Sequence, residues 1–412
     1  MKKLIKCSKL FSASDKTTKD NMAIIVSENI IEDVLPLSQI GSFDNYEVID
    51  LGDKFVMPGL IDCHTHCWAN GSFNDLNDLV RYTTSPAFYA VRGIKWVQDD
   101  LMGGFTTLRD AGCPGYADVA IRDAINQGYH WGPRMLVSGL PIHGVGGHGD
   151  NYFQPAFSGL GKDTVRAIVC GADEARQAAR TNFKYGADCI KFMSTFGVMT
   201  PGDDPGPQDL TFEEMRAICE VAEFRGKTTL THAHGREGIN CAVRAGVTSI
   251  DHGSFLDEET ADLMVEKGTY LVPTLIESRR MLKEMKPGEI AENVIAKSKY
   301  CISVHAKNIN MAYKKGVKIA FGTDVCAPYL YHGTQAEEFE LMVNEAGISP
   351  VDALLSATKT ASQLIKWENK VGTIEKGKLA DIIAVNGNPI ENISVMKDVK
   401  FVMKDGVVYK NN

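Results

Sequence analysis

Short apolar segments recur along most of this chain, and a longer amphipathic stretch follows each of them. The alternation runs from Met57 to about Lys366 and is typical of repeated strand–helix units that build a parallel sheet. Glycines placed like helix C-caps precede several segments, as in Ala245-Gly246-Val247. We expect eight strands, at residues 59–62, 106–109, 134–138, 189–192, 228–231, 248–251, 270–273 and 317–322. Eight such units predict an α/β fold of the (β/α)8 TIM-barrel type.

The two ends of the chain have a different pattern. Residues 1–56 and 369–412 consist of short β-type runs and turns, and Lys404-Asp405-Gly406 between apolar pairs indicates a hairpin. Neither flank is long enough to bury a good core alone. We therefore expect the flanks to pair into one small β-sandwich domain, beside a barrel domain formed by residues 57–368.

The first predicted barrel strand leads into two histidines, His64 and His66, separated by one residue. Side chains alternate along a strand, so the two imidazoles point in the same direction. Two imidazoles with this spacing can chelate one metal ion, and neutral imidazole suits zinc and its neighbours. Taken alone, the motif is equally consistent with two polar residues that close a loop.

Three later predicted strands also end at a potential metal ligand, namely His232, His252 and Asp324. A fourth ends at Lys191 among apolar residues, where an unpaired ammonium group would be costly to bury. In a (β/α)8 barrel the C-terminal ends of all strands meet at one face, so these side chains should gather there. A salt bridge to a nearby acid, or a path to solvent, remains open for the lysine.

The composition of the chain argues against some classes of binding partner and bears on its cellular location. The net charge is −8 and no basic stripe is present, which argues against a nucleic-acid surface. No apolar run approaches the length of a membrane span, and Lys6 and Lys9 interrupt any signal-like apolar core. The 10 cysteines include no CxxC pair, which fits a reducing compartment. We expect a soluble, cytoplasmic protein without nucleic-acid or membrane partners.

In this order and spacing, the motifs resemble those of the amidohydrolase superfamily of metal-dependent hydrolases. The similarity covers nearly the whole chain, from Pro-Gly-Leu-Ile-Asp at 58–62 through residues 104–110 to Gly-Lys-Leu-Ala-Asp at 377–381. The resemblance implies a binuclear site, usually zinc. It assigns one metal ion to His64, His66 and Asp324 and the other to His232 and His252.

The same resemblance implies that Lys191 is carboxylated by CO₂ on its side-chain nitrogen and bridges both ions. Carboxylation converts a cation into an anion with two oxygens, which suits that position. A hydroxide between the metals would be the nucleophile, with its pKa lowered by both charges. Asp324 would take the proton of this hydroxide and pass it to the leaving amine, while one metal polarises the scissile carbonyl.

More narrowly, the chain resembles the branch that contains Xaa-Pro dipeptidases and zinc-dependent arginine or lysine carboxypeptidases. The matching segments are residues 146–150, 186–192, 197–199 and 232–235. In that branch the position of His234 neighbours the substrate, and histidine there resembles the members that release a basic C-terminal residue.

We therefore expect His234 to bind substrate. His148, in a glycine-rich loop, is expected to reach a substrate carbonyl or carboxylate, although a solvent-exposed loop histidine is the alternative. His143 and His332 are weaker candidates. A basic leaving residue would need an acidic partner, for which the candidates are Asp203, Asp204 and Asp209, each of which could equally be a solvated turn residue.

The main prediction is a metal-dependent hydrolase that cleaves the amide bond next to a C-terminal amino acid in a small or short peptide substrate. An N-acyl amino acid, an aryl amide or a xenobiotic such as ochratoxin is an alternative substrate, because each needs the same attack on a carbonyl. An enzyme similar to imidazolonepropionase or cytosine deaminase is less consistent, since those sites typically hold one metal and lack the equivalent of Lys191. A non-catalytic scaffold, as among dihydropyrimidinase relatives, would usually lack ligands that are all present here. The family fold often assembles, which makes a homo-oligomer possible, but the sequence shows no interface signal.

Overall fold

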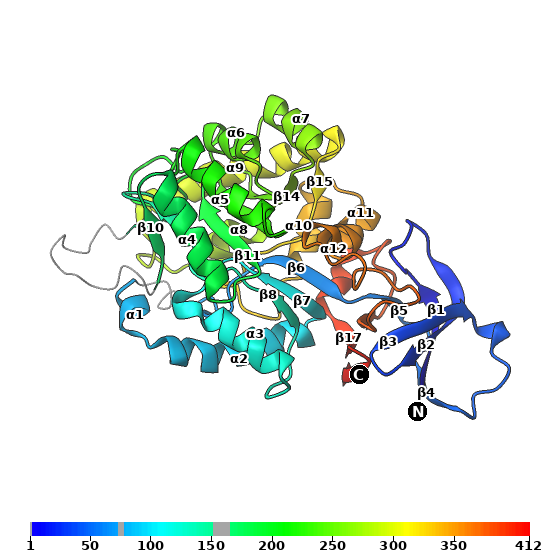
Figure 1. Cartoon of the computed structure of the whole chain (residues 1–412). Helices are drawn as coiled ribbons and strands as arrows, with labels where there is room; N and C mark the ends of the chain where they lie inside the picture. Colours follow the sequence, from blue (N-terminus) through cyan, green and yellow to red (C-terminus); the bar gives the residue numbers. More distant parts are fainter. Residues whose placement is uncertain (1, 73–77, 151–164) are drawn as a thin grey trace.

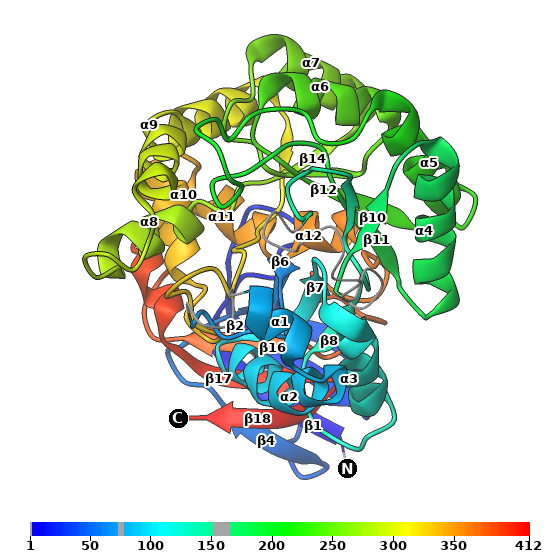
Figure 2. The same cartoon turned by 90° about the vertical axis from the view of Figure 1, so that its left-hand side faces the viewer.

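The computed structural model describes residues 2–72, 78–150 and 165–412. The chain has a mixed α/β fold, with a large helix-rich body and a β-sheet at one end that contains both termini (Figure 1). Figure 2 shows the helices of the body arranged around the outside of its strands.

The strands of the body form two parallel sheets. The smaller sheet contains three strands, β6 (Leu60–Thr65), β7 (Phe105–Asp110) and β8 (Arg134–Leu136). The larger sheet has the strand order β10 (Ala167–Val169), β9 (Ile142–Gly144), β11 (Cys189–Met193), β12 (Thr228–Ala233), β13 (Ser249–His252), β14 (Tyr270–Val272) and β15 (Lys318–Ile319). Each of the eight predicted strands therefore overlaps an observed one, and β9 and β10 were not predicted.

Backbone hydrogen bonds cross between the two sheets on both sides. After β8, the carbonyl of Val137 accepts from the N–H of Asp188 (2.7 Å) just before β11. Beyond β15, the N–H of Cys63 donates to Phe321 (2.9 Å) and the N–H of Asp324 donates to His64 (2.9 Å). The two sheets thus follow each other in the order that the barrel prediction requires, while a closed barrel stays a prediction.

Local sequence explains where many helices begin and end. A capping box of Thr211 and Glu214 starts α5, and the left-handed glycines Gly246 and Gly316 end α6 and α9. The C-cap at Gly246 was predicted from the sequence. The α-helices are α1 (Asp78–Thr83), α2 (Pro86–Met102), α3 (Ala117–Asn126), α4 (Ala172–Lys184), α5 (Phe212–Glu223), α6 (Arg236–Ala245), α7 (Glu258–Lys267), α8 (Ile276–Glu284), α9 (Glu292–Lys315), α10 (Glu337–Asn344), α11 (Pro350–Ser356) and α12 (Lys359–Leu364). Short 3-10 helices are η1 (Leu37–Gln39), η3 (Pro114–Tyr116) and η4 (Ile393–Lys397).

The two flanks of the chain form one sheet. Its strand order is β18 (Val407–Asn411), β17 (Val399–Lys404), β16 (Ile382–Val385), β5 (Phe55–Pro58), β1 (Lys2–Leu10), β2 (Lys19–Ser27) and β3 (Ile30–Pro36), and β4 (Tyr46–Asp50) pairs with β1. β5 joins the flanks, because it pairs in parallel with β1 and antiparallel with β16. Ile5, Ile24 and Phe401 share one buried apolar cluster on this sheet. The sandwich arrangement and the domain borders stay predictions, and the border predicted at residue 57 lies within β5.

In the described part of the chain, no helix combines the length and the apolar character that crossing a membrane requires. The cytoplasmic location and the homo-oligomer stay predictions.

Candidate metal centre

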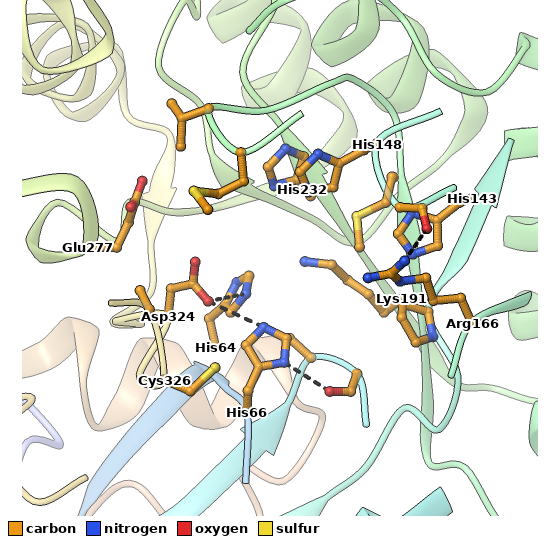
Figure 3. Close-up of a pocket in the computed structure, with 18 of the residues that line it drawn as sticks. His64, His66, His143, His148, Arg166, Lys191, His232, Glu277, Asp324 and Cys326 are labelled. Carbon is orange, nitrogen blue, oxygen red and sulfur yellow. Dashed lines mark hydrogen bonds and ion pairs between the residues drawn. The ribbon is translucent and has the colours of Figure 1, made fainter. Parts of the chain in front are cut away.

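A single cavity of about 500 Å³ collects the side chains that follow the strands of the body (Figure 3). All of the predicted metal-ligand and substrate-binding residues line it, namely His64, His66, His148, Lys191, His232, His234, His252 and Asp324. These residues come from parts of the chain that are up to 260 positions apart, and the common direction of the strands brings them together.

The first cluster of potential ligands consists of His64, His66 and Asp324, whose ligand atoms lie within 4.8 Å of one another. Nε2 of His64 and Nε2 of His66 lie 3.4 and 3.3 Å from Oδ1 of Asp324. Burial alone would raise the pKa of Asp324, but the two histidines outweigh burial and hold the pKa below its ordinary value. Asp324 has a left-handed backbone (φ +62°), which the hydrogen bond from its N–H to His64 helps to hold.

The second cluster consists of His232, His234 and His252, again with ligand atoms within 4.8 Å of one another. Their ring centroids are 4.7 to 5.0 Å apart. Burial lowers the pKa of all three imidazoles, that of His234 to about 3. They are therefore neutral near pH 7, and neutral imidazole is the form that binds a metal ion. The sequence predicted His234 as a substrate neighbour, and the structure also places it within reach of a metal in this cluster.

Each of the four histidines predicted as ligands has one ring nitrogen next to a polar group of the fold. The contacts are His64 Nδ1 with Asp251 Oδ2 (2.9 Å), His66 Nδ1 donating to the Gly112 carbonyl (2.9 Å), His232 Nε2 donating to the Phe196 carbonyl (3.1 Å) and His252 Nδ1 with Thr274 Oγ1 (2.6 Å). Such contacts fix the ring orientation and leave the other nitrogen for a metal. The donor set therefore fits a metal site.

Lys191 extends from β11 into the cavity (Figure 3). It is only 1% exposed, and its Nζ lies 3.8 Å from Oδ2 of Asp251. Burial lowers the pKa of Lys191, because the charged ammonium is poorly solvated there. Of the two possibilities that the sequence left open for this lysine, the salt bridge is present at the long distance of 3.8 Å, and the side chain is buried.

Asp251 and Arg109 belong to this centre, although no role was predicted for either residue. Asp251 is fully buried and accepts from Arg109 Nη2 (3.3 Å) and Ser249 Oγ (2.9 Å), besides its contact with His64. Arg109 is also fully buried and donates Nε–H to the Cys63 carbonyl (2.6 Å). Burial would raise the pKa of Asp251, but Arg109 and His64 outweigh it and lower the pKa. This pair therefore places a negative charge behind the His64 ring.

His148 lies against the second cluster. Its ring stacks on that of His232, with centroids 4.3 Å apart, and its Nδ1 hydrogen-bonds with Thr200 Oγ1 (2.6 Å). The loop that carries it is fixed by Asp209, whose carboxylate accepts from the N–H of His148 (2.7 Å) and of Gly144 (2.8 Å). His148 is thus a cavity residue, not a solvent-exposed loop histidine.

The acidic residues considered for a basic leaving group lie elsewhere. Asp209 has the structural contacts just described, Asp203 is exposed, and Asp204 is exposed and accepts from the N–H of Gly206 (2.7 Å) within a turn. None of the three lines the cavity. The turn interpretation is therefore the better one for Asp204.

The two weaker candidates, His143 and His332, differ in whether they line the cavity. His143 is buried, lines the cavity, and has no hydrogen-bond partner for its ring nitrogens in the described residues. His332 does not line the cavity. Its ring nitrogens hydrogen-bond to Asp100 Oδ2 (2.7 Å) and to the Ala69 carbonyl (2.8 Å). A further cavity residue, Glu277 near the start of α8, was not predicted, since a single glutamate at a helix start carries no spacing signal.

Comparisons with known proteins agree with this geometry. A family model described as the amidohydrolase family matches residues 55–409. The chain is 32% identical to an ochratoxinase of Aspergillus niger over 412 aligned positions, covering 95% of this chain and 83% of that protein. A solved Xaa-Pro dipeptidase with methionine bound in its active site matches with a TM-score of 0.88 and 35% identity over 100% of both chains. A prolidase in complex with N-methylphosphonate-L-proline matches with a TM-score of 0.90 and 29% identity, also over 100% of both chains. The chain belongs to the amidohydrolase family, as its sequence motifs predicted.

Proposed function

We propose that this protein is a metal-dependent hydrolase that cleaves the amide bond next to a C-terminal amino acid in a dipeptide or short peptide. The observation that carries the proposal is the pair of ligand clusters that share one cavity with the buried Lys191. A cavity of about 500 Å³ is in the usual range for a small-molecule site. The similar proteins, a Xaa-Pro dipeptidase, a prolidase and an ochratoxinase, support hydrolysis of amide bonds.

In this proposal His64, His66 and Asp324 hold one divalent ion, and His232 and His252 hold a second. Imidazole nitrogens and a carboxylate oxygen suit zinc or a similar ion. When bound, such ions supply a water of lowered pKa and polarise a carbonyl. The fit rests on the ring contacts described above, which leave one nitrogen of each histidine available.

Lys191 is the proposed bridge between the two ions, in its carboxylated form. Because burial lowers its pKa, more of this lysine is the neutral amine than in water, and only that form attacks CO₂. The new N–C bond forms as the amine loses one proton, and the product is a carbamate with one negative charge shared by two oxygens. The negative charge of the carbamate would lie between two clusters of metal ligands, where attraction to the bound cations would offset its cost of burial.

Asp324 is the proposed proton carrier. The two histidines hold its pKa low, so it is a carboxylate when a water molecule attacks the substrate. Its Oδ1 lies against His64 and His66, and in Figure 3 the other carboxylate oxygen points away from them. Asp324 would accept the proton of the attacking water and deliver it to the amine that leaves. His148 and His234 would orient the substrate, since both line the cavity beside His232.

A second candidate function is hydrolysis of an N-acyl amino acid or an aryl amide of the ochratoxin type. The 32% identity to ochratoxinase along 95% of this chain favours it, and both functions need the same centre. A mononuclear deaminase or ring-opening enzyme is a weaker interpretation, because Lys191 lies buried beside the ligand clusters.

Metal analysis of the purified protein, followed by a substrate screen, tests these proposals. The screen contains Xaa–amino acid dipeptides, N-acyl amino acids and aryl amides, and release of the free amino acid is measured. Two zinc ions per chain with dipeptide cleavage support the main proposal. Two zinc ions with cleavage of N-acyl or aryl amides alone support the second. One ion per chain, with ammonia released from heterocyclic amines, would contradict both.

A further inference from the structure

The walls of the cavity differ in charge. Figure 3 shows Glu277 and Asp324 on one side and His143 and Arg166 on the opposite side, with Lys191 between them. Arg166 is buried and donates Nη1–H to the Gly149 carbonyl (2.6 Å), which holds its guanidinium group at that wall. A substrate that spans the cavity therefore meets an acidic group at one end and a basic group at the other.

Glu277 has a different environment from the other carboxylates that line the cavity in the described residues. Asp324 belongs to the first ligand cluster, and Asp150 accepts from the N–H of Gly146 (2.8 Å). Glu277 accepts only from the hydroxyl of Ser278 (2.7 Å), and no cationic side chain of the described part of the chain lies within 4.0 Å of it. Burial, and after it the charge of Asp324, raises the pKa of Glu277 to about 8, although Ser278 and Arg279 act in the opposite direction. A cationic group placed against Glu277 would lower this pKa and favour the carboxylate.

The position of Glu277 is fixed by the fold. Glu338 accepts from the N–H groups of Leu275 (2.9 Å) and Ile276 (2.7 Å), which anchors the first turn of α8. Thr274, just before this turn, has a left-handed backbone (φ +48°), which is unfavourable for a β-branched residue. Its hydroxyl hydrogen-bonds with His252 Nδ1 (2.6 Å), so the segment that carries Glu277 is tied to the second ligand cluster.

We infer that Glu277 is the counter-ion for a cationic group of the substrate, so that the enzyme prefers peptides with such a group to neutral N-acyl or aryl amides. The inference rests on the proposed function and names its substrate class. Either the free α-ammonium group of the first residue or a basic side chain supplies the charge. The substrate carboxylate then faces the wall of Arg166, which fits a zwitterion.

Paired substrates that differ only in this charge test the inference. One pair is a dipeptide and its N-formyl derivative, and the other is the same dipeptide with lysine or norleucine as its C-terminal residue. Glu277→Gln should lower kcat/KM at least about tenfold for every substrate that carries the cationic group bound by Glu277, as expected for the loss of a charge-assisted hydrogen bond, and should leave substrates without that group nearly unchanged. The pair that shows the loss identifies the cationic group.

Glu284→Gln is the matched control, because Glu284 is an exposed glutamate on the same helix. This variant should match the wild-type protein on all four substrates. Glu277→Asp keeps the charge and should keep the preference for the cationic member, which separates loss of charge from misfolding. Equal losses of kcat/KM on the two members within both pairs, or no loss on any of the four substrates, would overturn this inference and leave the proposed function standing. If the wild-type protein cleaves neither pair, the proposed peptidase function falls and the inference falls with it.

Discussion

The buried pair Asp251–Arg109 allows a sharp test of how the metal centre is supported. Asp251→Asn keeps the size of the side chain but removes the charge that faces His64 Nδ1 at 2.9 Å and Arg109 Nη2 at 3.3 Å. Asparagine can still accept one hydrogen bond, from Arg109 or from Ser249. The substitution therefore isolates the charge from the packing.

Two effects of different origin are expected. Removing one partner of a buried ion pair costs about 3–5 kcal/mol. Arg109 keeps its bond to the Cys63 carbonyl (2.6 Å) and its bond to Ser249 Oγ (3.1 Å), so we expect the lower end, about 3 kcal/mol, in the free energy of unfolding. His64 also loses the group that fixes its ring, and loss of such a contact weakens metal binding about 10–100-fold.

Urea unfolding of the metal-free proteins measures the first effect, and competition with a chromogenic chelator measures the second. Asp173→Asn is the control, because Asp173 is fully exposed and pairs with Arg176 (2.7 Å) on the surface of α4. Such surface pairs contribute less than about 1 kcal/mol. An Asp251→Asn protein with the stability and the zinc affinity of this control would refute the argument that a buried charge behind His64 supports the centre.

Three further predictions concern other residues of the centre and its surroundings. Lys191→Ala should lower both metal content and activity, with partial recovery when a short carboxylic acid replaces the missing bridge; full activity without added acid would exclude the bridging role. Asp324→Asn should abolish turnover while metal analysis still finds most of the zinc, and near-normal turnover would remove Asp324 from proton transfer. For His332, burial would lower the pKa, but Asp100 outweighs burial and raises it above 6.5. The stabilisation from His332 is therefore fully present below about pH 6.5 and is lost as the pH rises through the raised pKa. The difference in unfolding free energy between the wild-type protein and His332→Gln should shrink as the pH rises above about 6.5, as measured by urea unfolding, and a constant difference would contradict the assignment.

The sequence was sufficient to predict the potential metal ligands that gather in the cavity, because each of them follows a strand with a clear apolar pattern. For His64, His232 and Asp324, the apolar pattern predicts the strand, and the polar residue at its end is the potential ligand. The three-residue strands β9 and β10 were not predicted, since three residues are too few to show alternation of apolar and polar side chains.

Roles that depend on long-range contacts could not be read from the chain. Asp251 directly precedes His252, but its partner Arg109 is 142 positions away, and no local pattern joins them. Asp209 had the same status as Asp203 in the sequence, and only the fold shows that it accepts two backbone N–H groups of the loop that carries His148. Glu277 follows no periodic pattern, and its place in the cavity depends on Glu338, far along the chain.

The position of β5 between β1 and β16 has a consequence for how the chain is made. β5 is synthesised early, yet its antiparallel partner at residues 382–385 follows about 320 residues later. At typical rates of synthesis this interval lasts roughly 20–60 s, during which one edge of β5 lacks its hydrogen-bond partners. Open edges of this kind pair readily with other chains. Residues 382–385, which do not line the cavity, are therefore needed to cover this edge of β5 and to limit aggregation of the nascent chain.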